Sequence, residues 1–304
     1  MNPPGRRIRP AIVLAYGKIN LTLEILARRD DGYHALRSVM LPIGLADEIA
    51  IEPAERFGFT CEPAQLGPGN LVVRTLERVG LAGAPYAVTL RKHIPVGAGL
   101  GGGSSDAAAI LRAAMSGAFG PVAARDWLAD ARALGSDIPL FLVDGGALVE
   151  GTGERVTALG ALPPWSIVLL VPGVHVATPD AFRRLAKSRA AVAPPVRPRN
   201  ESASLRALVA LQRGDYPAAI AAAVNDFEPL VSEAYPAVGA ALDALRAAGA
   251  RHAMLSGSGG ACFALCPDDA SAQALAARVR VPDGARLAVV PFAPSASWRA
   301  PTPA

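Results

Sequence analysis

The chain has 304 residues, of which 51% are hydrophobic and 18% charged, and its formal net charge is +4. This composition excludes a disordered chain and provides enough apolar residues for one large domain or two ordinary ones. The basic residues form no long run and only 5% of the residues are aromatic, so nucleic acid is not an expected partner. A small-molecule ligand that carries several phosphates accounts for the positive charge.

The cysteines and the N-terminus bear on the compartment in which the protein works. The chain has an odd number of cysteines, without the paired spacing of a metal site: Cys61, Cys262 and Cys266. We therefore expect buried, reduced thiols. The apolar run over residues 11–15 is too short for a signal peptide, and no stretch has the length of a membrane span. We therefore expect a cytoplasmic protein without a membrane partner.

The N-terminal part of the chain is expected to consist of strands around one short helix. Its patterns predict strands over residues 8–15, 19–27, 47–52 and 86–92 and a helix over residues 70–80. Lys18 lies in the break between the first two strands. A polar turn over residues 28–34 carries Tyr33 and His34, two side chains that can recognise a planar ligand.

The most distinctive stretch is the glycine loop of residues 95–103, Pro-Val-Gly-Ala-Gly-Leu-Gly-Gly-Gly. Glycine allows positive φ angles and the close approach of several backbone N–H groups to a ligand. A helix is expected behind the loop, with Ser104 or Ser105 as its N-cap and Asp106 in its first turn. The N-terminus of a helix favours an anion, so we expect a triphosphate at this loop.

Three other interpretations of the glycine loop are weaker. Gly97, Gly99 and Gly102 match the spacing of a dinucleotide fingerprint, but that fingerprint needs an acidic residue about 20 positions on, at the end of a strand. Asp126 and Asp130 lie instead within a helical pattern. A P-loop is excluded because no Lys-Ser or Lys-Thr pair follows the glycines. A tight structural turn before a core helix remains as the third alternative.

The rest of the chain mixes helices and strands, which indicates an α+β fold with helices on one face of an antiparallel sheet. The patterns predict helices over residues 123–134, 204–213, 216–224, 237–248 and 269–279 and one from about residue 178, and strands over residues 147–150, 155–159, 167–171, 252–255, 261–266 and 287–292. Pro163-Pro164 predicts a boundary between domains of residues 1–163 and 164–304. Residues 189–202 are expected to form a flexible loop, and the tail over residues 293–304 is expected to fray.

Two residues are candidates for the chemistry of phosphoryl transfer, which needs charge neutralisation, an aligned hydroxyl and usually a base. Asp137 follows the end of a predicted helix and precedes an apolar segment expected to be a strand that removes water from the carboxylate. Lys18 lies between apolar strands, where an unpaired ammonium is costly. The alternatives are a turn residue for Asp137 and a solvated strand-end lysine for Lys18.

Two further segments have both a functional and a structural interpretation. The second glycine turn, residues 255–261, forms either a simple hairpin or a cover over the phosphates from the second domain. Tyr33, His34 and Phe182 could hold a nucleobase, although each alone is more often a core or surface residue.

Together these segments resemble the GHMP kinases, a family whose Pro-x-x-x-Gly-Leu-Gly-Ser-Ser-like loop binds ATP outside any P-loop fold. The specific match to the family loop covers residues 95–108. Finer features of the resemblance lie in residues 18–21, 31–34, 99–105, 135–139 and 256–259. It implies an α+β, two-domain fold: an N-terminal α/β domain with a left-handed crossover, followed by a ferredoxin-like C-terminal domain. Tyr16-Gly17 departs from the Pro-Ala that many relatives have before the lysine.

Finer features resemble the family members of the non-mevalonate isoprenoid pathway, and imply ATP- and Mg²⁺-dependent phosphorylation of a methylerythritol 2-hydroxyl in a cytidyl-diphosphate substrate. Asp137 would then take the hydroxyl proton, and Lys18 would support that oxygen and the γ-phosphate. The implied substrate-binding residues are Asn20, Tyr33, His34, Thr152, Pro179 and Phe182. The implied ATP-binding residues are Asn70, Pro95, Val96, Gly97, Ala98, Gly99, Leu100, Gly101, Gly102, Gly103, Ser104 and Ser105. Ser104, Ser105 or Asp106 would hold the metal.

Two rival functions are kept beside this one. The first is another GHMP activity, such as homoserine or mevalonate kinase, whose acceptors have no base for Tyr33, His34 and Phe182 to hold. The second is a nucleotide-binding regulator without catalysis, which the presence of both Lys18 and Asp137 disfavours. A small-molecule kinase acting as a monomer or weak homodimer is the expectation carried forward.

Overall fold

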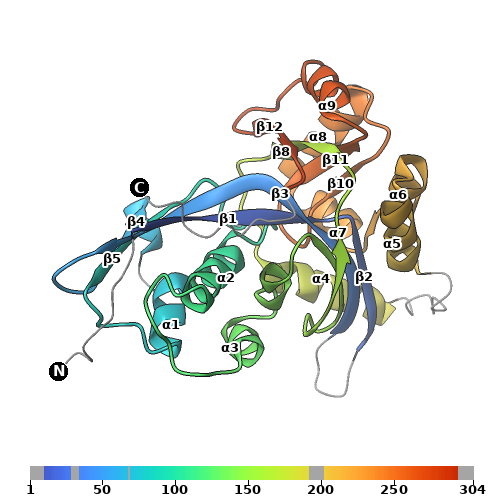
Figure 1. Cartoon of the computed structure of the whole chain (residues 1–304). Helices are drawn as coiled ribbons and strands as arrows, with labels where there is room; N and C mark the ends of the chain where they lie inside the picture. The colour runs from blue at the N-terminus through green and yellow to red at the C-terminus, as the bar shows by residue number, and fades with distance from the viewer. Residues whose placement is uncertain (1–9, 29–33, 68, 192–201, 294–304) are drawn as a thin grey trace.

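The computed structural model describes residues 10–28, 34–67, 69–191 and 202–293. In Figure 1 the long strands β1 and β3 cross the molecule, α1, α2 and α3 lie below them, and a second sheet with α8 and α9 lies above. The helices are α1 (Leu71–Arg78), α2 (Gly102–Met115), α3 (Trp127–Leu134), α4 (Thr178–Ala191), α5 (Ala203–Arg213), α6 (Tyr216–Ala222), α7 (Glu228–Ala234), α8 (Pro236–Ala247) and α9 (Asp269–Ala276). Two short 3₁₀ helices are η1 (Ala64–Leu66) and η2 (Pro139–Leu142).

The N-terminal sheet is organised around one long strand, β3. Its first half pairs with β2 and β6, its second half pairs with β5, and β1 pairs with residues 40–51 across both halves. The strands of this sheet are β1 (Ala11–Asn20), β2 (Thr22–Arg28), β3 (His34–Pro53), β4 (Gly58–Glu62), β5 (Tyr86–Arg91), β6 (Gly146–Gly151), β7 (Arg155–Gly160) and β9 (Val224–Asn225). β4 and β5 are parallel neighbours joined through α1; the left hand of such a crossover stays a prediction.

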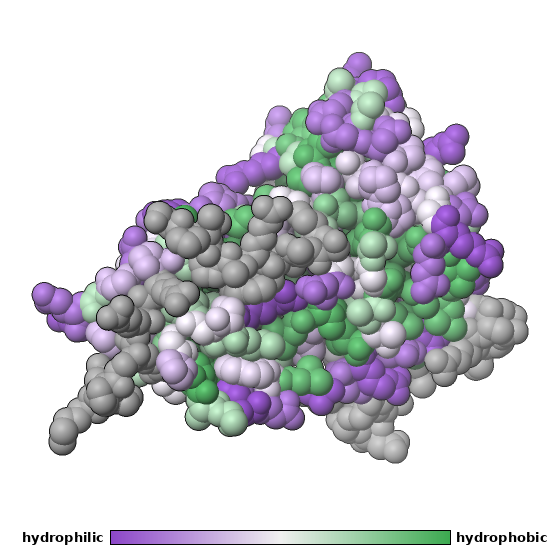
Figure 2. Space-filling view, in the orientation of Figure 1, coloured by the Kyte–Doolittle hydropathy of each residue, from purple (hydrophilic) through white to green (hydrophobic). Residues whose placement is uncertain are grey.

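The C-terminal sheet confirms the ferredoxin-like expectation. Its strands are β8 (Ser166–Val171), β10 (Ala253–Leu255), β11 (Cys262–Cys266) and β12 (Arg286–Pro291). They lie in the order β10-β11-β8-β12 with every neighbouring pair antiparallel, which is the arrangement of a β-α-β-β-α-β unit. The outer surface around α9 is largely hydrophilic (Figure 2), as expected of a helix that covers a sheet with its apolar side.

The described residues form four buried hydrophobic clusters. One lies between the N-terminal sheet and α1 to α3 and includes Tyr86 and Phe119. Another joins the two halves of the chain, since Ile19 and Leu41 share it with Phe263. The three cysteines are buried free thiols, as predicted. No helix within the described ranges is long and apolar enough to cross a membrane.

Several predicted boundaries were wrong because strand pairing overrode local patterns. The break expected around Lys18 is only a bulge within β1, and the chain breaks at Leu21 instead. The strand predicted over residues 47–52 is the end of the much longer β3. The helix predicted from residue 123 begins at Trp127, capped by the Asp126 carboxylate. The structure also contains β4 and α7, which the patterns did not predict.

Two predictions on irregular segments have a mixed outcome. The loop expected over residues 189–202 is helical up to Ala191, because α4 extends to that residue; residues 192–201 lie outside the described ranges. The tail was expected to fray from residue 293, but Ala293 is buried and its N–H donates to the Pro42 carbonyl at 2.9 Å. Residues 294–304 also lie outside the described ranges.

A buried carboxylate, Glu24 on β2, fixes the start of α5. Its oxygens accept hydrogen bonds from the Ser202 hydroxyl at 2.6 Å and from the N–H groups of Ala203 at 3.1 Å and Ser204 at 3.0 Å. Burial alone raises the pKa of Glu24, but the hydrogen bonds from Ser202, Ser204 and Ala203 outweigh it and hold the pKa below its ordinary value. Glu24 therefore stabilises the fold in its ionised form.

We expect Glu24→Gln to lower the free energy of unfolding by about 2 kcal/mol at neutral pH, because its amide nitrogen faces N–H and O–H donors. A depressed folded-state pKa contributes stability above the unfolded value of about 4.3 and loses it as the pH falls through the folded value. The difference from wild type should therefore shrink below about pH 4. Urea unfolding of both proteins from neutral pH to below pH 4 measures this difference in the free energy of unfolding. Glu77→Gln, at an exposed position, is the control, and equal losses in both variants would contradict the assignment.

Candidate active site

A cleft of about 1490 Å³ lies between the two halves of the chain. Residues of β1 and β2, the glycine loop and the start of α2 line it from the N-terminal half. α4, Phe227 and the second glycine turn line it from the C-terminal half. The cleft thus gathers the segments that the sequence singled out.

The glycine loop has the conformation that its composition predicts. Gly97, Gly99 and Gly101 have φ angles of +70°, +82° and +72°, which only glycine adopts readily. Gly101 is the N-cap of α2, so the helix begins at Gly102. The prediction of Ser104 or Ser105 as the N-cap was therefore wrong, because a left-handed glycine can turn the chain into the helix without a side-chain cap.

The second glycine turn is a hairpin and also packs directly on the glycine loop. It connects β10 to β11, which pair at Leu255 and Cys262. The Ala261 N–H donates to the Ala98 carbonyl at 2.9 Å. A Cβ on Gly99 would collide with the Ser256 carbonyl and lie 2.9 Å from the Gly259 nitrogen. The two glycine segments therefore meet backbone to backbone, which fixes the shape of this end of the cleft.

Lys18 lies at the bulge of β1 and points into the cleft. Its ammonium donates to Asn20 Oδ1 at 2.7 Å and to the Gly99 carbonyl at 2.6 Å, and the side chain is only 4% exposed. Burial lowers the pKa of Lys18, and the charge of Asp137 opposes that lowering. Asn20 in turn donates to the Ser38 hydroxyl at 2.8 Å. Hydrogen bonds thus hold the Lys18 ammonium in place, and the methylene part of the side chain is buried.

Asp137 lines the same cleft, just beyond the end of α3. It is half-buried and is followed by the 3₁₀ helix η2. The expectation of a strand after Asp137 was wrong, because Pro139 at the start of this segment favours a helical turn. Asp137 thus attracts the Lys18 ammonium, and these two residues are called the charged pair below; Lys92 and Asp106 line the same cleft.

A buried charge cluster that the sequence did not reveal lies below the glycine loop. The Lys92 ammonium donates to Asp47 at 2.5 Å and to Asp106 at 2.6 Å. Burial raises the pKa of Asp106 to about 7, while Lys92 opposes this. The sequence did offer one signal for this role of Lys92. The lysine ends a predicted strand and is separated from Pro95, the first residue of the glycine loop, by only two residues.

The predicted ATP-binding residues differ in how they face the cleft. All of those from Pro95 to Ser104 line it, as does Asn70, whose side chain also caps α1. Ser105 does not line this cleft, since its hydroxyl donates to the Tyr16 carbonyl at 2.6 Å. Of these two serines, Ser104 is therefore the one whose residue lines the cleft.

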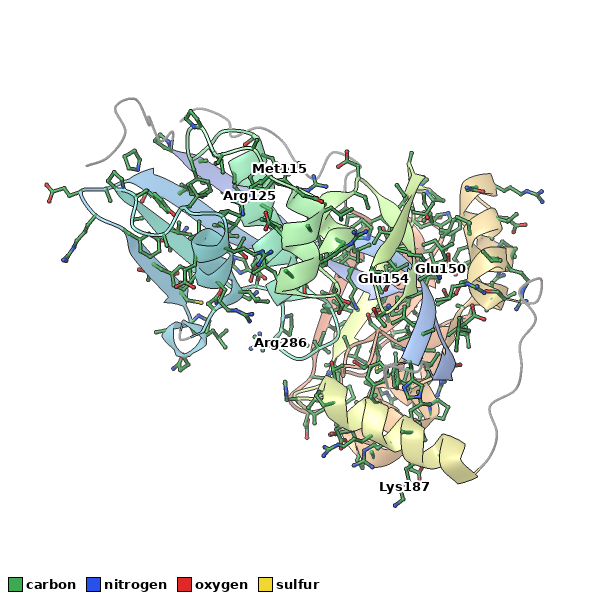
Figure 3. All side chains as sticks on the ribbon, turned by 90° about the horizontal axis from the view of Figure 1, so that it is seen from below. Met115, Arg125, Glu150, Glu154, Lys187 and Arg286 are labelled. Atoms are coloured by element: carbon green, nitrogen blue, oxygen red, sulfur yellow. The ribbon has the colours of Figure 1, made fainter. Side chains whose placement is uncertain are left out.

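Aromatic residues of β3, of α4 and of the segment before α7 also line the cleft. The rings of His34 and Phe182 lie 6.3 Å apart, and Phe182 packs edge-on against Phe227 at 4.9 Å. Tyr33 lies outside the described residues. In the view from below, Lys187 lies on α4, and Glu150 and Glu154 lie close together at the β6–β7 hairpin (Figure 3).

Two further predicted substrate-binding residues, Pro179 and Thr152, also line the cleft. Pro179 lies in the first turn of α4 and is exposed. The Thr152 hydroxyl donates to Glu154 at 2.8 Å, so its oxygen remains free to accept a hydrogen bond from a ligand.

Comparisons with known proteins agree with this geometry. Residues 70–145 match the GHMP kinases N terminal domain and residues 207–281 match the family described as GHMP kinases C terminal. The 4-diphosphocytidyl-2-C-methyl-D-erythritol kinase of Pelotomaculum thermopropionicum is 39% identical over 92% of this chain and 98% of its own. The enzyme of the same name from Deinococcus radiodurans is 40% identical over 86% of each chain.

Solved structures show the same relationship. A crystal structure of 4-(cytidine 5'-diphospho)-2C-methyl-D-erythritol kinase superposes with a TM-score of 0.75 at 36% identity, covering 93% of this chain and all of that one. Homoserine kinase from Cytophaga hutchinsonii shares the fold at 18% identity, with a TM-score of 0.67 over 96% of each chain. By identity, coverage and fold, the chain belongs to the GHMP kinases, and within them to the 4-diphosphocytidyl-2-C-methyl-D-erythritol kinase family.

Proposed function

We propose that the protein transfers the γ-phosphate of ATP to the 2-hydroxyl of 4-diphosphocytidyl-2-C-methyl-D-erythritol. One observation carries this proposal: a single cleft is lined by the glycine loop, by the aromatic group of His34 and Phe182, and by Lys18 and Asp137. The names of the relatives supply the acceptor. The lining of the cleft supports this proposal, because it combines aromatic side chains with a glycine loop.

The residues of the cleft have separate roles in the proposed transfer. The N–H groups of the glycine loop and of the α2 N-terminus bind the phosphates. Asp137 accepts the proton of the acceptor hydroxyl, and Lys18 stabilises negative charge on that oxygen and on the transferred phosphoryl group. Lys18 is already desolvated and fixed by Asn20 and Gly99, so little reorganisation accompanies the transfer. Positioning and charge stabilisation then supply most of the rate.

Magnesium is expected with ATP, and the residues at the start of α2 fit it. Magnesium sites in kinases use one or two carboxylates together with the phosphates. Asp106 lines the cleft, and its Oδ1 is buried without a hydrogen-bond partner among the described residues. Asp106 and the Ser104 hydroxyl would therefore hold the ion. When bound, the ion would neutralise phosphate charge.

The aromatic end of the cleft favours a cytidyl acceptor over that of the other family activities. Homoserine and mevalonate offer no ring to stack, whereas His34 and Phe182 form a wall suited to a nucleobase.

For compartment, oligomeric state and domain bounds, we propose what the sequence predicts. The protein is a cytoplasmic enzyme that acts as a monomer or weak homodimer, with domains of residues 1–163 and 164–304.

Asp137→Asn should lower kcat by at least about 100-fold, because the amide cannot accept the hydroxyl proton. Its affinity for ATP should stay within about threefold of wild type, since the glycine loop is untouched. A coupled ADP-release assay and ATP titration measure the two quantities. Asp283→Asn, at an exposed position, serves as the control. Near-normal kcat in Asp137→Asn would remove Asp137 as the base.

Phe182→Ala should raise the KM for the cytidyl substrate by about tenfold and leave the KM for ATP unchanged, because base stacking on an aromatic ring is worth about 1–3 kcal/mol. Phe182 also packs on Phe227, so Phe182→Leu is the matched variant that preserves apolar volume without a ring. A smaller rise in the leucine variant is expected. An unchanged KM in both would mean that the base binds elsewhere.

A further inference from the structure

The segment of residues 225–228, Asn-Asp-Phe-Glu, connects β9 to α7 and was not singled out by sequence patterns. β9 pairs in parallel with β2, Thr22 opposite Val224 and Leu23 opposite Asn225. A piece of the C-terminal half thereby joins the N-terminal sheet. The segment lies next to the second glycine turn on one side and the aromatic wall on the other.

Asn225 uses its side-chain amide fully and is only 6% exposed. Its Nδ2 donates to the carbonyls of Leu255 and Gly257, each at 2.8 Å. Its Oδ1 accepts from the Phe227 N–H at 2.9 Å. Because two carbonyls need donors and one N–H needs an acceptor, this place suits an amide and not a carboxylate.

Gly257, whose carbonyl accepts one of the two hydrogen bonds from Asn225, lies beside Lys18. It has a φ angle of +62°. A Cβ there would lie 3.2 Å from Lys18 Nζ, from Asn20 Oδ1 and from the Gly99 carbonyl. A shift of Gly257 would therefore press on the ammonium or open space beside it.

The other end of the Asn225 amide reaches the aromatic wall. It fixes the backbone of Phe227, whose buried ring packs edge-on against Phe182. Glu228 adds a second hydrogen bond from this segment to β10, since its carboxylate accepts from the Leu255 N–H at 2.8 Å. Both backbone groups of Leu255 are thus bound by side chains of this one segment.

We infer that Asn225 is a positioning residue for phosphoryl transfer: through Gly257 it sets the second glycine turn against Lys18, and through Phe227 it aligns the aromatic wall with that turn. Asn225 acts on the reaction through these residues. The inference rests on the proposed function for its kinetic effect, but its effect on the glycine turn stands without it.

The test uses the full-length protein with Asn225→Asp, which is isosteric and replaces both donated hydrogen bonds by repulsion between oxygens. A lower kcat, by about tenfold or more, is expected, with the KM for each substrate within about threefold, because the ligand-binding groups remain and their alignment changes. Asn225→Ser, which introduces no buried charge, is the second variant in case the aspartate variant does not fold.

Tyr216→Phe is the matched control, because it removes a hydrogen bond of 2.7 Å from the Tyr216 hydroxyl to the Leu265 carbonyl of β11. It should lower the thermal midpoint without changing kcat. Asn225 variants that lose stability but keep kcat within about twofold of wild type would overturn the inference, since a purely structural residue behaves in that way.

Hydrogen exchange gives a second readout that does not depend on turnover. Residues 97–101 and 255–261 should exchange faster in Asn225→Asp, or in Asn225→Ser if that variant is used, and at the wild-type rate in Tyr216→Phe. Unchanged exchange in both glycine segments would overturn the inference. If wild type fails to phosphorylate the cytidyl substrate, the proposed function fails, and hydrogen exchange still decides the role of Asn225.

Discussion

The structure depends on one costly feature, a lysine ammonium held away from water between two sheets. A buried charge is tolerated only when polar groups and an opposite charge surround it. Lys18 meets this condition through Asn20, the Gly99 carbonyl and the field of Asp137. Each of these partners comes from a different part of the fold. The bulge in β1, the glycine loop and the end of α3 are therefore constrained together, and a phosphoryl group could enter a site whose charges are already in place.

The glycines explain how two halves of the chain can meet at this lysine. Gly99 and Gly259 lie so close that a side chain on either would collide with the other's backbone. This contact brings the hairpin of the C-terminal sheet against the glycine loop, while α4 of the same half carries Phe182, which also lines the cleft. The cleft exists only when both halves are folded and packed, which agrees with the buried cluster that they share.

The sequence identified the parts whose signal is local. The glycine loop, Lys18 and Asp137 could be chosen from composition and neighbours alone, and the ferredoxin-like order followed from the resemblance. The parts that depend on distant partners were missed. The length of β3 is set by strands on both sides, Lys92 gains meaning only beside Asp47 and Asp106, and Asn225 binds residues far along the chain. The helix cap was misjudged because a left-handed glycine replaced the expected serine.

The central claim is that one cleft joins a triphosphate end to a nucleobase end across Lys18 and Asp137. ADP release by the purified protein with ATP and Mg²⁺ tests it most directly, with 4-diphosphocytidyl-2-C-methyl-D-erythritol, homoserine and mevalonate offered separately as acceptors. The claim predicts turnover with the cytidyl substrate alone. Turnover with homoserine or mevalonate instead would contradict the role given to the aromatic end, and ATP binding without turnover of any acceptor would contradict the role given to the charged pair.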